Sequence, residues 1–184
     1  YIEATIQNTE AIVLIDEAYV DFADYNHLDL LEKYDNVIIS RTMSKSYSLA
    51  GMRVGFAIAS PAIIEQMDKV RDSYNLDRLA QTLATAAFNY QDYFRKIWQT
   101  VRQTRTRLTE ALRDLDFLVP ESDANFVFAA PQWIEAEKLY SELKERKVLV
   151  RYFKTLRISN YVRISIGTDE EIDRLLDAIA EIKQ

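Results

Sequence analysis

Cysteine is absent from this chain of 184 residues, and glycine, proline and histidine are scarce, with three, three and one residue. Without cysteine, disulfide bonds, thiol nucleophiles and thiolate metal ligands are all excluded. No apolar run approaches the roughly 20 residues that a membrane-spanning helix needs, and residues 1–7 lack the features of a signal peptide. We therefore expect a cytoplasmic protein with no membrane partner and no metal site.

Basic residues are fewer than acidic ones. The chain has 23 lysines and arginines and 29 aspartates and glutamates, for a net charge of -6. Nucleic-acid backbones recruit basic surfaces, so this balance argues against a general nucleic-acid binder. Any site for an anion has to be formed locally by a few basic residues. The hydrophobic share of 48% suffices for one sizeable core, or for one modest core and part of another.

Three short apolar runs early in the chain predict buried strands. They are residues 11–15, 37–39 and 54–59. The first run ends at Asp16 and Glu17, and the second leads into a polar stretch at residues 40–48. Ligands of open α/β sheets gather at the carboxyl ends of the strands, so we expect these polar residues to share one edge.

Helical patterns fill most of the remaining chain. Ser60 followed by Pro61 predicts a helix start, because serine caps free amides and proline fits the first helical position. Apolar residues at helical spacing follow in residues 63–70, 76–87 and 94–115. After Pro120, strands are predicted at residues 126–128, 148–150 and 162–166, with a helix at residues 134–144. Thr168 and Glu171 form a capping box before a last amphipathic helix.

These patterns predict an α/β protein in three parts. Residues 1–90 belong to a large α/β domain, residues 91–115 form a long connecting helix, and residues 116–184 form a small α/β domain.

Two of the three glycines, Gly51 and Gly55, flank Arg53, which indicates a close approach of the backbone there. The surrounding residues 40–56 read SRTMSKSYSLAGMRVGF and closely resemble fold-type I aminotransferases, especially the histidinol-phosphate group. The resemblance implies that Lys45 forms a Schiff base with the aldehyde of pyridoxal 5'-phosphate. A bare S-x-K match would indicate only a solvated loop lysine, but here the whole stretch lies between two apolar strands. A partly desolvated amine near positive neighbours becomes a usable nucleophile and base.

The same resemblance assigns the cofactor phosphate to Arg53, with Thr42 and Ser44 as hydroxyl donors. A guanidinium fork fits a phosphate dianion well. The alternatives are a surface ion pair for Arg53 and turn-capping roles for the two hydroxyls.

Residues 16–19 read DEAY, and the resemblance assigns Asp16 to the pyridine nitrogen of the cofactor and Tyr19 to its phenolic oxygen. A carboxylate beside the ring nitrogen keeps that nitrogen protonated, so the ring can accept electrons from the substrate Cα. Such a charge-assisted hydrogen bond contributes roughly 1.5 to 3 kcal/mol. Glu17 takes no role from the resemblance, and we expect it to be solvated or ion-paired.

Residues 160–168 read NYVRISIGT and match the family strand whose arginine binds the substrate α-carboxylate, here Arg163. An arginine within an apolar strand needs a partner, and a bidentate carboxylate is the obvious one. Arg151 resembles a second family arginine, near the distal phosphate of the substrate. Lys154 and Arg157 are alternatives for that role, because the loop of residues 152–159 differs in length among relatives.

Asn125 and Tyr74 also match family positions that line the substrate site. Their alternatives are a satisfied turn residue and a half-buried core aromatic. His27 lies in a loop, and we expect no chemical role for it.

For the fold, the resemblance implies the carboxyl-terminal part of the large cofactor-binding domain, a mostly parallel sheet with helices, and the small carboxyl-terminal domain of fold-type I aminotransferases. For the complete protein it implies transfer of the amino group of histidinol phosphate to 2-oxoglutarate in a homodimer. Aromatic aminotransferases and threonine-phosphate decarboxylases share these motifs and are the alternatives. The family's ring-stacking and phosphate-loop segments lie upstream, so we expect this chain alone not to transaminate. Its exposed apolar edges and faces predict either self-association or association with the missing fragment.

A P-loop ATPase is a remote alternative, because residues 11–18, AIVLIDEA, resemble the strand and acids that hold magnesium in that class. The G-x-x-x-x-G-K-S/T loop of that class does not occur in the chain. A ligand-sensing regulator built on an aminotransferase domain is a third possibility, but no DNA-binding part is recognisable.

Overall fold

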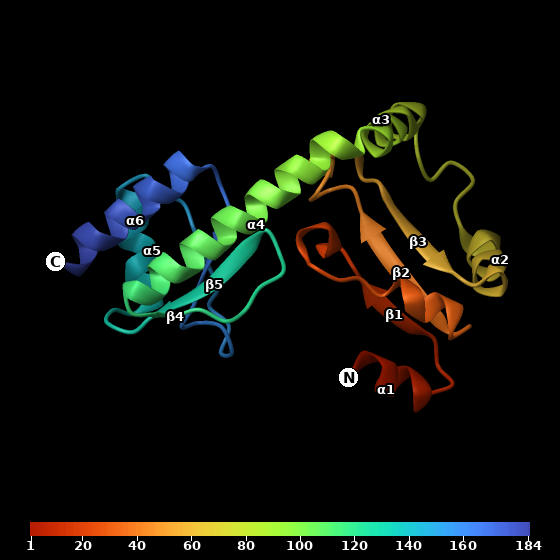
Figure 1. Ribbon diagram of the computed structural model, residues 1–184, viewed down its shortest axis with the longest axis horizontal. Helices are drawn as coiled ribbons and strands as arrows, with labels where there is room; N and C mark the ends of the chain where they lie inside the picture. Colours follow the sequence, from red (N-terminus) through yellow and green to blue (C-terminus); the bar gives the residue numbers. More distant parts are fainter. The chain divides into compact units, whose positions relative to one another are not determined.

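The first sheet of the protein lies in residues 1–96, one of the two units into which the computed structural model of residues 1–184 divides; residues 97–184 form the other (Figure 1). Strand β1 (Val13–Asp16) pairs in parallel with β2 (Val37–Thr42), and β2 pairs antiparallel with β3 (Gly55–Ala59). The three predicted strands are therefore present, but the sheet is mixed rather than mostly parallel. The reason is the connection, since residues 43–54 form a loop rather than the crossover helix that a parallel strand would need.

Helices and short 3-10 turns surround this sheet. The predicted helices are present as α2 (Pro61–Val70) and α3 (Arg78–Asn89). Four further elements are too short for a periodic pattern and were not predicted. They are α1 (Ile2–Gln7) and the turns η1 (Val20–Phe22), η2 (Leu28–Glu32) and η3 (Ala50–Met52). Ser60 precedes α2 as expected, but its hydroxyl donates to the Asp35 carbonyl instead of capping the helix.

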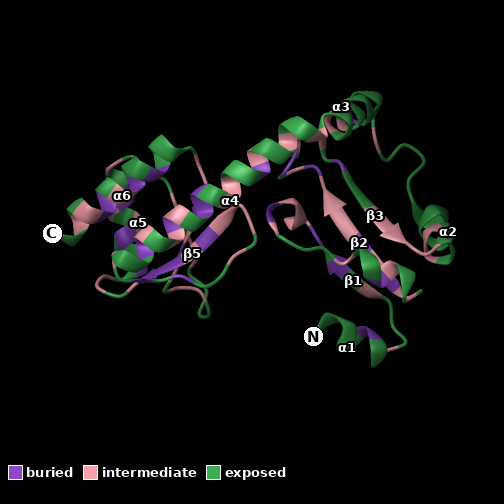
Figure 2. Ribbon diagram, viewed as in Figure 1, coloured by how far each residue is buried: buried purple, intermediate pink, exposed green.

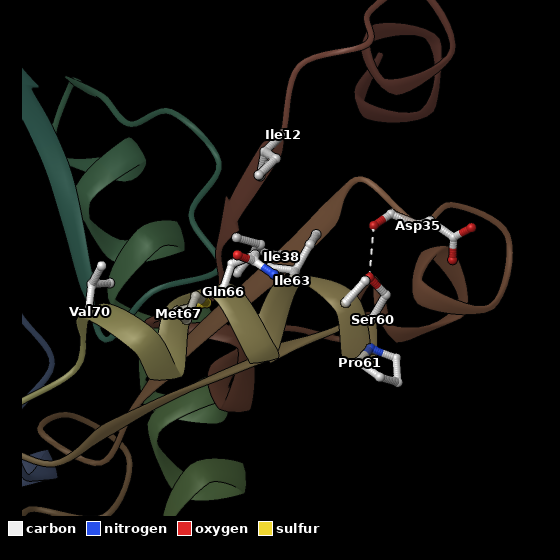
Figure 3. A pocket seen from close by; sticks show the side chains of 10 residues that line it. Ile12, Asp35, Ile38, Ser60, Pro61, Ile63, Gln66, Met67 and Val70 are labelled. Atoms are coloured by element: carbon white, nitrogen blue, oxygen red, sulfur yellow. Dashed lines mark hydrogen bonds between the residues drawn. The ribbon is translucent and has the colours of Figure 1, made fainter. Parts of the chain in front are cut away.

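The core of this unit is small. It consists of Ile6, Ile15, Leu30, Val37 and Ile39. No residue of α2 is buried, and much of α3 is also exposed (Figure 2). A hollow of about 810 Å³ runs along α2 and is lined by apolar side chains such as Ile12, Ile38 and Met67 (Figure 3). None of the candidate site residues lines this hollow, so it is an uncovered apolar surface rather than a candidate active site.

The long amphipathic helix predicted from the sequence is α4 (Gln91–Asp114), and its residues belong to both units. The division into residues 1–90, 91–115 and 116–184 stays a prediction about the complete protein.

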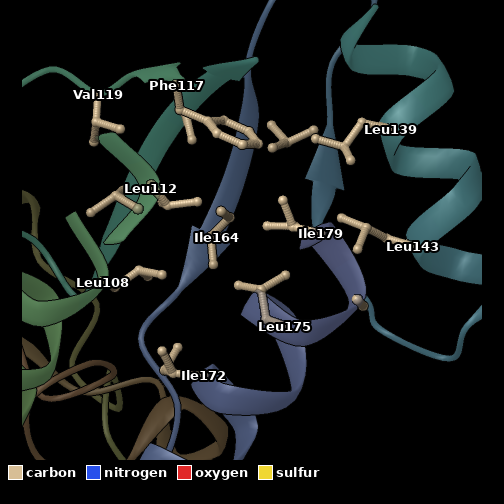
Figure 4. Packing of buried hydrophobic residues seen from close by; sticks show 14 of the residues in the cluster. Leu108, Leu112, Phe117, Val119, Leu139, Leu143, Ile164, Ile172, Leu175 and Ile179 are labelled. Carbon is tan, nitrogen blue, oxygen red and sulfur yellow. The ribbon is translucent and has the colours of Figure 1, made fainter. Parts of the chain in front are cut away.

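The second unit is an antiparallel sheet packed on helices. Strands β4 (Phe117–Leu118), β5 (Phe126–Pro131), β6 (Arg151–Tyr152) and β7 (Val162–Ser165) lie in the order β4-β5-β7-β6. Helices α5 (Ala136–Glu145) and α6 (Asp169–Lys183) complete it. Figure 4 shows the core, in which Leu112 of α4, Leu143 of α5 and Ile179 of α6, all fully buried, pack in one cluster with the sheet.

The strand predicted at residues 148–150 is wrong. Lys147 has a left-handed backbone (φ 62°), and the Val148 amide donates to the Leu143 carbonyl at 2.9 Å, which closes the end of α5. Pairing with β7 therefore starts only at Arg151.

The capping box at the start of α6 is confirmed. The Thr168 hydroxyl accepts from the Glu171 amide, and the Glu171 carboxylate accepts from the Thr168 amide. A Cβ at position 167 would collide with that carboxylate, which explains the glycine there.

A buried ion pair joins the carboxyl ends of β1 and β2. Glu17 is only 6% exposed, and its Oε2 accepts from Nε and Nη2 of Arg41 at 2.9 and 2.7 Å. Its Oε1 accepts from the His27 amide at 2.7 Å and lies 3.1 Å from His27 Nδ1. Of the two expectations for Glu17, the ion-paired one is confirmed. His27, expected to have no chemical role, is part of the packing around this carboxylate.

Replacing Glu17 by glutamine keeps the shape of the side chain but leaves Arg41 without its counter-charge. We expect the free energy of unfolding of the complete protein to fall by about 3 kcal/mol, the lower end for breaking a buried pair, because Arg41 is partly exposed. Urea unfolding followed by circular dichroism measures it. Asp29→Asn, which breaks the exposed pair with Lys33, is the matched control. Equal losses in the two variants would contradict the prediction.

Candidate active site

The lysine loop, residues 43–54, leaves the end of β2 and returns to β3. It closes on itself, because the Met43 amide donates to the Val54 carbonyl and the Leu49 amide donates to the Met43 carbonyl, each at 3.0 Å. The Thr42 hydroxyl donates to the Val54 carbonyl at 3.3 Å and accepts from the Ser44 amide at 3.1 Å. Thr42 thus builds the loop, as its turn-capping alternative anticipated.

Lys45 lies on this loop with its side chain exposed. Its ammonium is 5.7 Å from the centroid of the Tyr19 ring, a cation–π arrangement, and no carboxylate pairs with it. The Tyr19 ring therefore orients the amine, and no acidic side chain pairs with it. The sequence predicts a partly desolvated amine, whereas Lys45 is exposed to solvent in residues 1–184.

Asp16 is the last residue of β1 and Tyr19 follows that strand, at the same edge of the sheet. The parallel register pairs Asp16 with Ser40, so the ends of β1 and β2 lie side by side. Oδ1 of Asp16 accepts from the Ala18 amide at 3.0 Å, which fixes the exposed carboxylate in a turn. The expected shared edge is confirmed, and the acid, the phenol and the amine lie on it.

Arg53 ends the lysine loop in a left-handed conformation, with φ 56° and ψ 37°. This conformation is uncommon for a residue with a side chain, and Ser48 in the same loop has φ 56° as well. Nη1 of Arg53 donates to the Ala50 carbonyl at 2.9 Å, and no carboxylate pairs with it. The surface ion pair considered as an alternative is absent.

The flanking glycines differ in what they allow. A Cβ at Gly55 would lie 3.0 Å from the Arg41 carbonyl oxygen, so the strand needs glycine there. At Gly51 no atom lies within 4 Å, and the expected close approach is not made by this chain.

Tyr47 is an anchor of the lysine loop that the sequence analysis missed. Its ring packs on Phe94 with centroids 5.0 Å apart, and its hydroxyl accepts from the Gln91 amide at 2.9 Å. Burial raises the pKa of the Tyr47 phenol. The loop is thereby fixed to the start of α4, and only the aromatic character of position 47 could have indicated it.

Tyr74 does not join these residues. It lies in the turn between α2 and α3 and is 91% exposed, so its alternative as a half-buried core aromatic is wrong. Its assignment to the substrate site stays a prediction.

In the second unit, Arg163 and Arg151 face each other across β7 and β6 as register partners. Nε of Arg163 is buried without a hydrogen bond, and no carboxylate pairs with either guanidinium. Asn125 lies at the start of β5, where its carbonyl accepts from the Ile166 amide at 2.9 Å. This hydrogen bond engages the Asn125 carbonyl, and a substrate role for the Asn125 side chain stays a prediction.

The two alternatives to Arg151 differ from it. Lys154 pairs with Glu137 at 2.5 Å, a hydrogen bond that raises the pKa of the lysine. Arg157 is exposed in the loop before β7. Arg151 is the one that shares the sheet with Arg163.

No group of three or more histidine, aspartate or glutamate residues is placed to hold a metal ion. None of the helices combines the length and the apolar character that a membrane span requires.

The chain was compared with known proteins. Residues 2–179 match the family model described as aminotransferase class I and II. The chain is 74% identical over 183 residues to histidinol-phosphate aminotransferase of Rippkaea orientalis, and 65% identical over 179 residues to that of Synechocystis. These alignments cover 100% and 97% of this chain but 53% and 51% of the relatives, so the chain spans about half their length.

A solved structure gives the same result for the fold. Histidinol-phosphate aminotransferase from Sinorhizobium meliloti, in complex with pyridoxal-5'-phosphate, matches with a TM-score of 0.81 at 28% identity, over 94% of this chain and 48% of that one. The α/β fold expected from the resemblance is thus confirmed. With a family match over nearly its whole length, the chain belongs to the class I and II aminotransferases.

Proposed function

We propose that the complete protein is a pyridoxal-phosphate-dependent aminotransferase that converts histidinol phosphate and 2-oxoglutarate into imidazole acetol phosphate and glutamate. The observation that carries the proposal is the 65–74% identity, over nearly all of this chain, to histidinol-phosphate aminotransferases. We also propose that the complete protein is a cytoplasmic homodimer, as the resemblance implies.

The groups around the lysine loop suit this cofactor chemically. An amine without a counter-ion suits an aldehyde, a carboxylate in a turn suits a protonated pyridine nitrogen, and an unpaired guanidinium suits a phosphate. Lys45, Asp16 and Arg53 provide these three groups. Tyr19 would donate to the phenolic oxygen, and Ser44 and Thr42 would complete the phosphate site.

Each residue has a definite task in the proposed reaction. When bound, the cofactor supplies an electron sink for the substrate Cα. Lys45 would hold the cofactor covalently between turnovers and, as a free amine, carry the proton between the substrate Cα and the cofactor C4' carbon. Asp16 keeps the ring nitrogen protonated. Arg163 binds the α-carboxylate of glutamate, and Arg151 binds the phosphate of the amino donor.

The alternatives receive less support. Aromatic aminotransferases and threonine-phosphate decarboxylases share the lysine-loop motif. The relatives that are 65–74% identical to this chain, however, are histidinol-phosphate aminotransferases. In the ATPase alternative Glu17 would hold magnesium, whereas its two oxygens here are bound by Arg41 and His27.

The first test is Lys45→Ala in the complete enzyme. Without the amine, the covalent link to the cofactor and the proton carrier are both lost, so turnover should fall by several orders of magnitude. The visible absorbance of the lysine-bound cofactor should disappear as well. Lys69→Ala, at an exposed lysine of α2, is the control and should keep both. Turnover and absorbance retained in Lys45→Ala would refute the assignment.

The second test separates the two arginines. Arg163→Ala should raise the KM for glutamate more than that for an amino donor without a carboxylate, because it removes the bidentate partner. Arg151→Ala should act most on phosphorylated donors. Steady-state kinetics with histidinol phosphate, histidinol and glutamate measure both effects. An Arg151→Ala variant that treats histidinol phosphate and histidinol alike would remove the local support for a phosphorylated donor.

The third test concerns residues 1–184 alone. Catalysis needs the cofactor ring to be fixed relative to Lys45, and the ring-stacking segment of the family lies outside this chain. We therefore expect no measurable glutamate formation when the purified chain is mixed with cofactor and both substrates. Light scattering should show self-association, because apolar residues such as Ile12 and Leu14 are exposed. Turnover close to that of the complete enzyme, with no upstream segment detected by mass spectrometry, would refute the prediction.

A further inference from the structure

The pair of arginines on β6 and β7 has an unusual electrostatic setting. Arg151 and Arg163 are register partners on adjacent strands, and like charges in that position destabilise a sheet. No carboxylate offsets them, and Nε of Arg163 is buried without a hydrogen bond. The two guanidinium groups therefore belong to opposite residues of adjacent strands, and neither is paired with a carboxylate.

One aromatic side chain contacts both arginines. The ring centroid of Phe153, just after β6, lies 5.3 Å from Cζ of Arg151 and 5.8 Å from Cζ of Arg163. The ring of Phe126 in β5 also contacts Arg163, with its centroid 5.2 Å from Cζ. The negative face of an aromatic ring attracts a guanidinium without competing for its N–H donors. Phe153 can therefore orient both side chains and leave their donors available to ligands.

The ring of Phe128 serves as a control, because it packs in the same aromatic cluster but has no cation–π contact with an arginine. Phe128 of β5 belongs to the same aromatic cluster, with its centroid 6.4 Å from that of Phe153 and 5.8 Å from that of Phe126. It has no cation–π contact with either arginine. Phe153 thus has a cation–π contact with both guanidinium groups, and Phe126 has one with Arg163.

We propose that Phe153 is a positioning residue that holds Arg151 and Arg163 together as a double anion site, one guanidinium for a carboxylate and the other for a phosphate. The assignment of the two anions rests on the proposed function, whereas the shared ring contact does not. Phe126 positions Arg163.

The test uses four variants of the complete enzyme carrying its cofactor: Phe153→Leu, Phe153→Tyr, Phe126→Leu and Phe128→Leu. Phe153→Leu should raise the KM for both glutamate and histidinol phosphate by roughly 5- to 20-fold, as expected for loss of cation–π contacts, with a smaller change in kcat. Phe126→Leu should raise the KM for glutamate alone. Phe153→Tyr, which keeps the ring face, and Phe128→Leu should remain within about twofold of the unmodified enzyme, since neither loses a cation–π contact.

A binding measurement keeps this inference separate from the proposed function. Calorimetry with succinate and with inorganic phosphate reports the two anion sites without turnover, and thermal unfolding checks that each variant is folded. Phe153→Leu should weaken both ligands, and Phe153→Met replaces it if the leucine variant does not fold. The inference is overturned if Phe153→Leu behaves like Phe128→Leu, or if Phe153→Tyr fails to restore binding. If the unmodified enzyme does not transaminate histidinol phosphate, the proposed function fails, but the succinate and phosphate results still decide the role of Phe153.

Discussion

The candidate active site in residues 1–96 depends on one contact, the buried ion pair of Glu17 and Arg41. Glu17 directly follows Asp16, and Arg41 directly precedes Thr42, so the pair fixes the two strand ends from which the candidate catalytic residues project. Burying a carboxylate is costly unless it is paired and hydrogen-bonded, and here both oxygens are engaged. Asp16 and Lys45, two of the candidate catalytic residues, remain exposed beside this paired interior carboxylate.

The two units distribute charge in different ways. In the first, the buried carboxylate is neutralised, and the loop adds strain at Ser48 and Arg53 to present its basic groups outward. In the second, the basic groups lie on a regular sheet and are stabilised by ring faces rather than by acids. Both arrangements leave basic groups without an acidic partner, in a protein whose net charge is -6.

The sequence predicted the features that have a local pattern, and it did not predict those that depend on contacts between residues far apart in the chain. Helices α2, α3, α4 and α6 followed from apolar spacing and caps, and the shared edge of Asp16 and the lysine loop followed from the strand-end rule. The antiparallel β3, the unpaired residues 148–150 and the Glu17–Arg41 pair did not, because each depends on contacts or connections that no local pattern encodes. Residues 17 and 41 are 24 positions apart. Likewise, the contact of Phe153 with two arginines depends on the pairing of β6 with β7.

The order β4-β5-β7-β6 has an evolutionary consequence. Arg163 lies on β7, which has neighbours on both sides, whereas Arg151 lies on a two-residue edge strand followed by the exposed loop of residues 154–160. Insertions and deletions in that loop alter the edge without disturbing the interior strands. In the proposed function Arg163 binds the carboxylate and Arg151 the phosphate, so changes in this loop would alter recognition of the phosphate end more than recognition of the carboxylate.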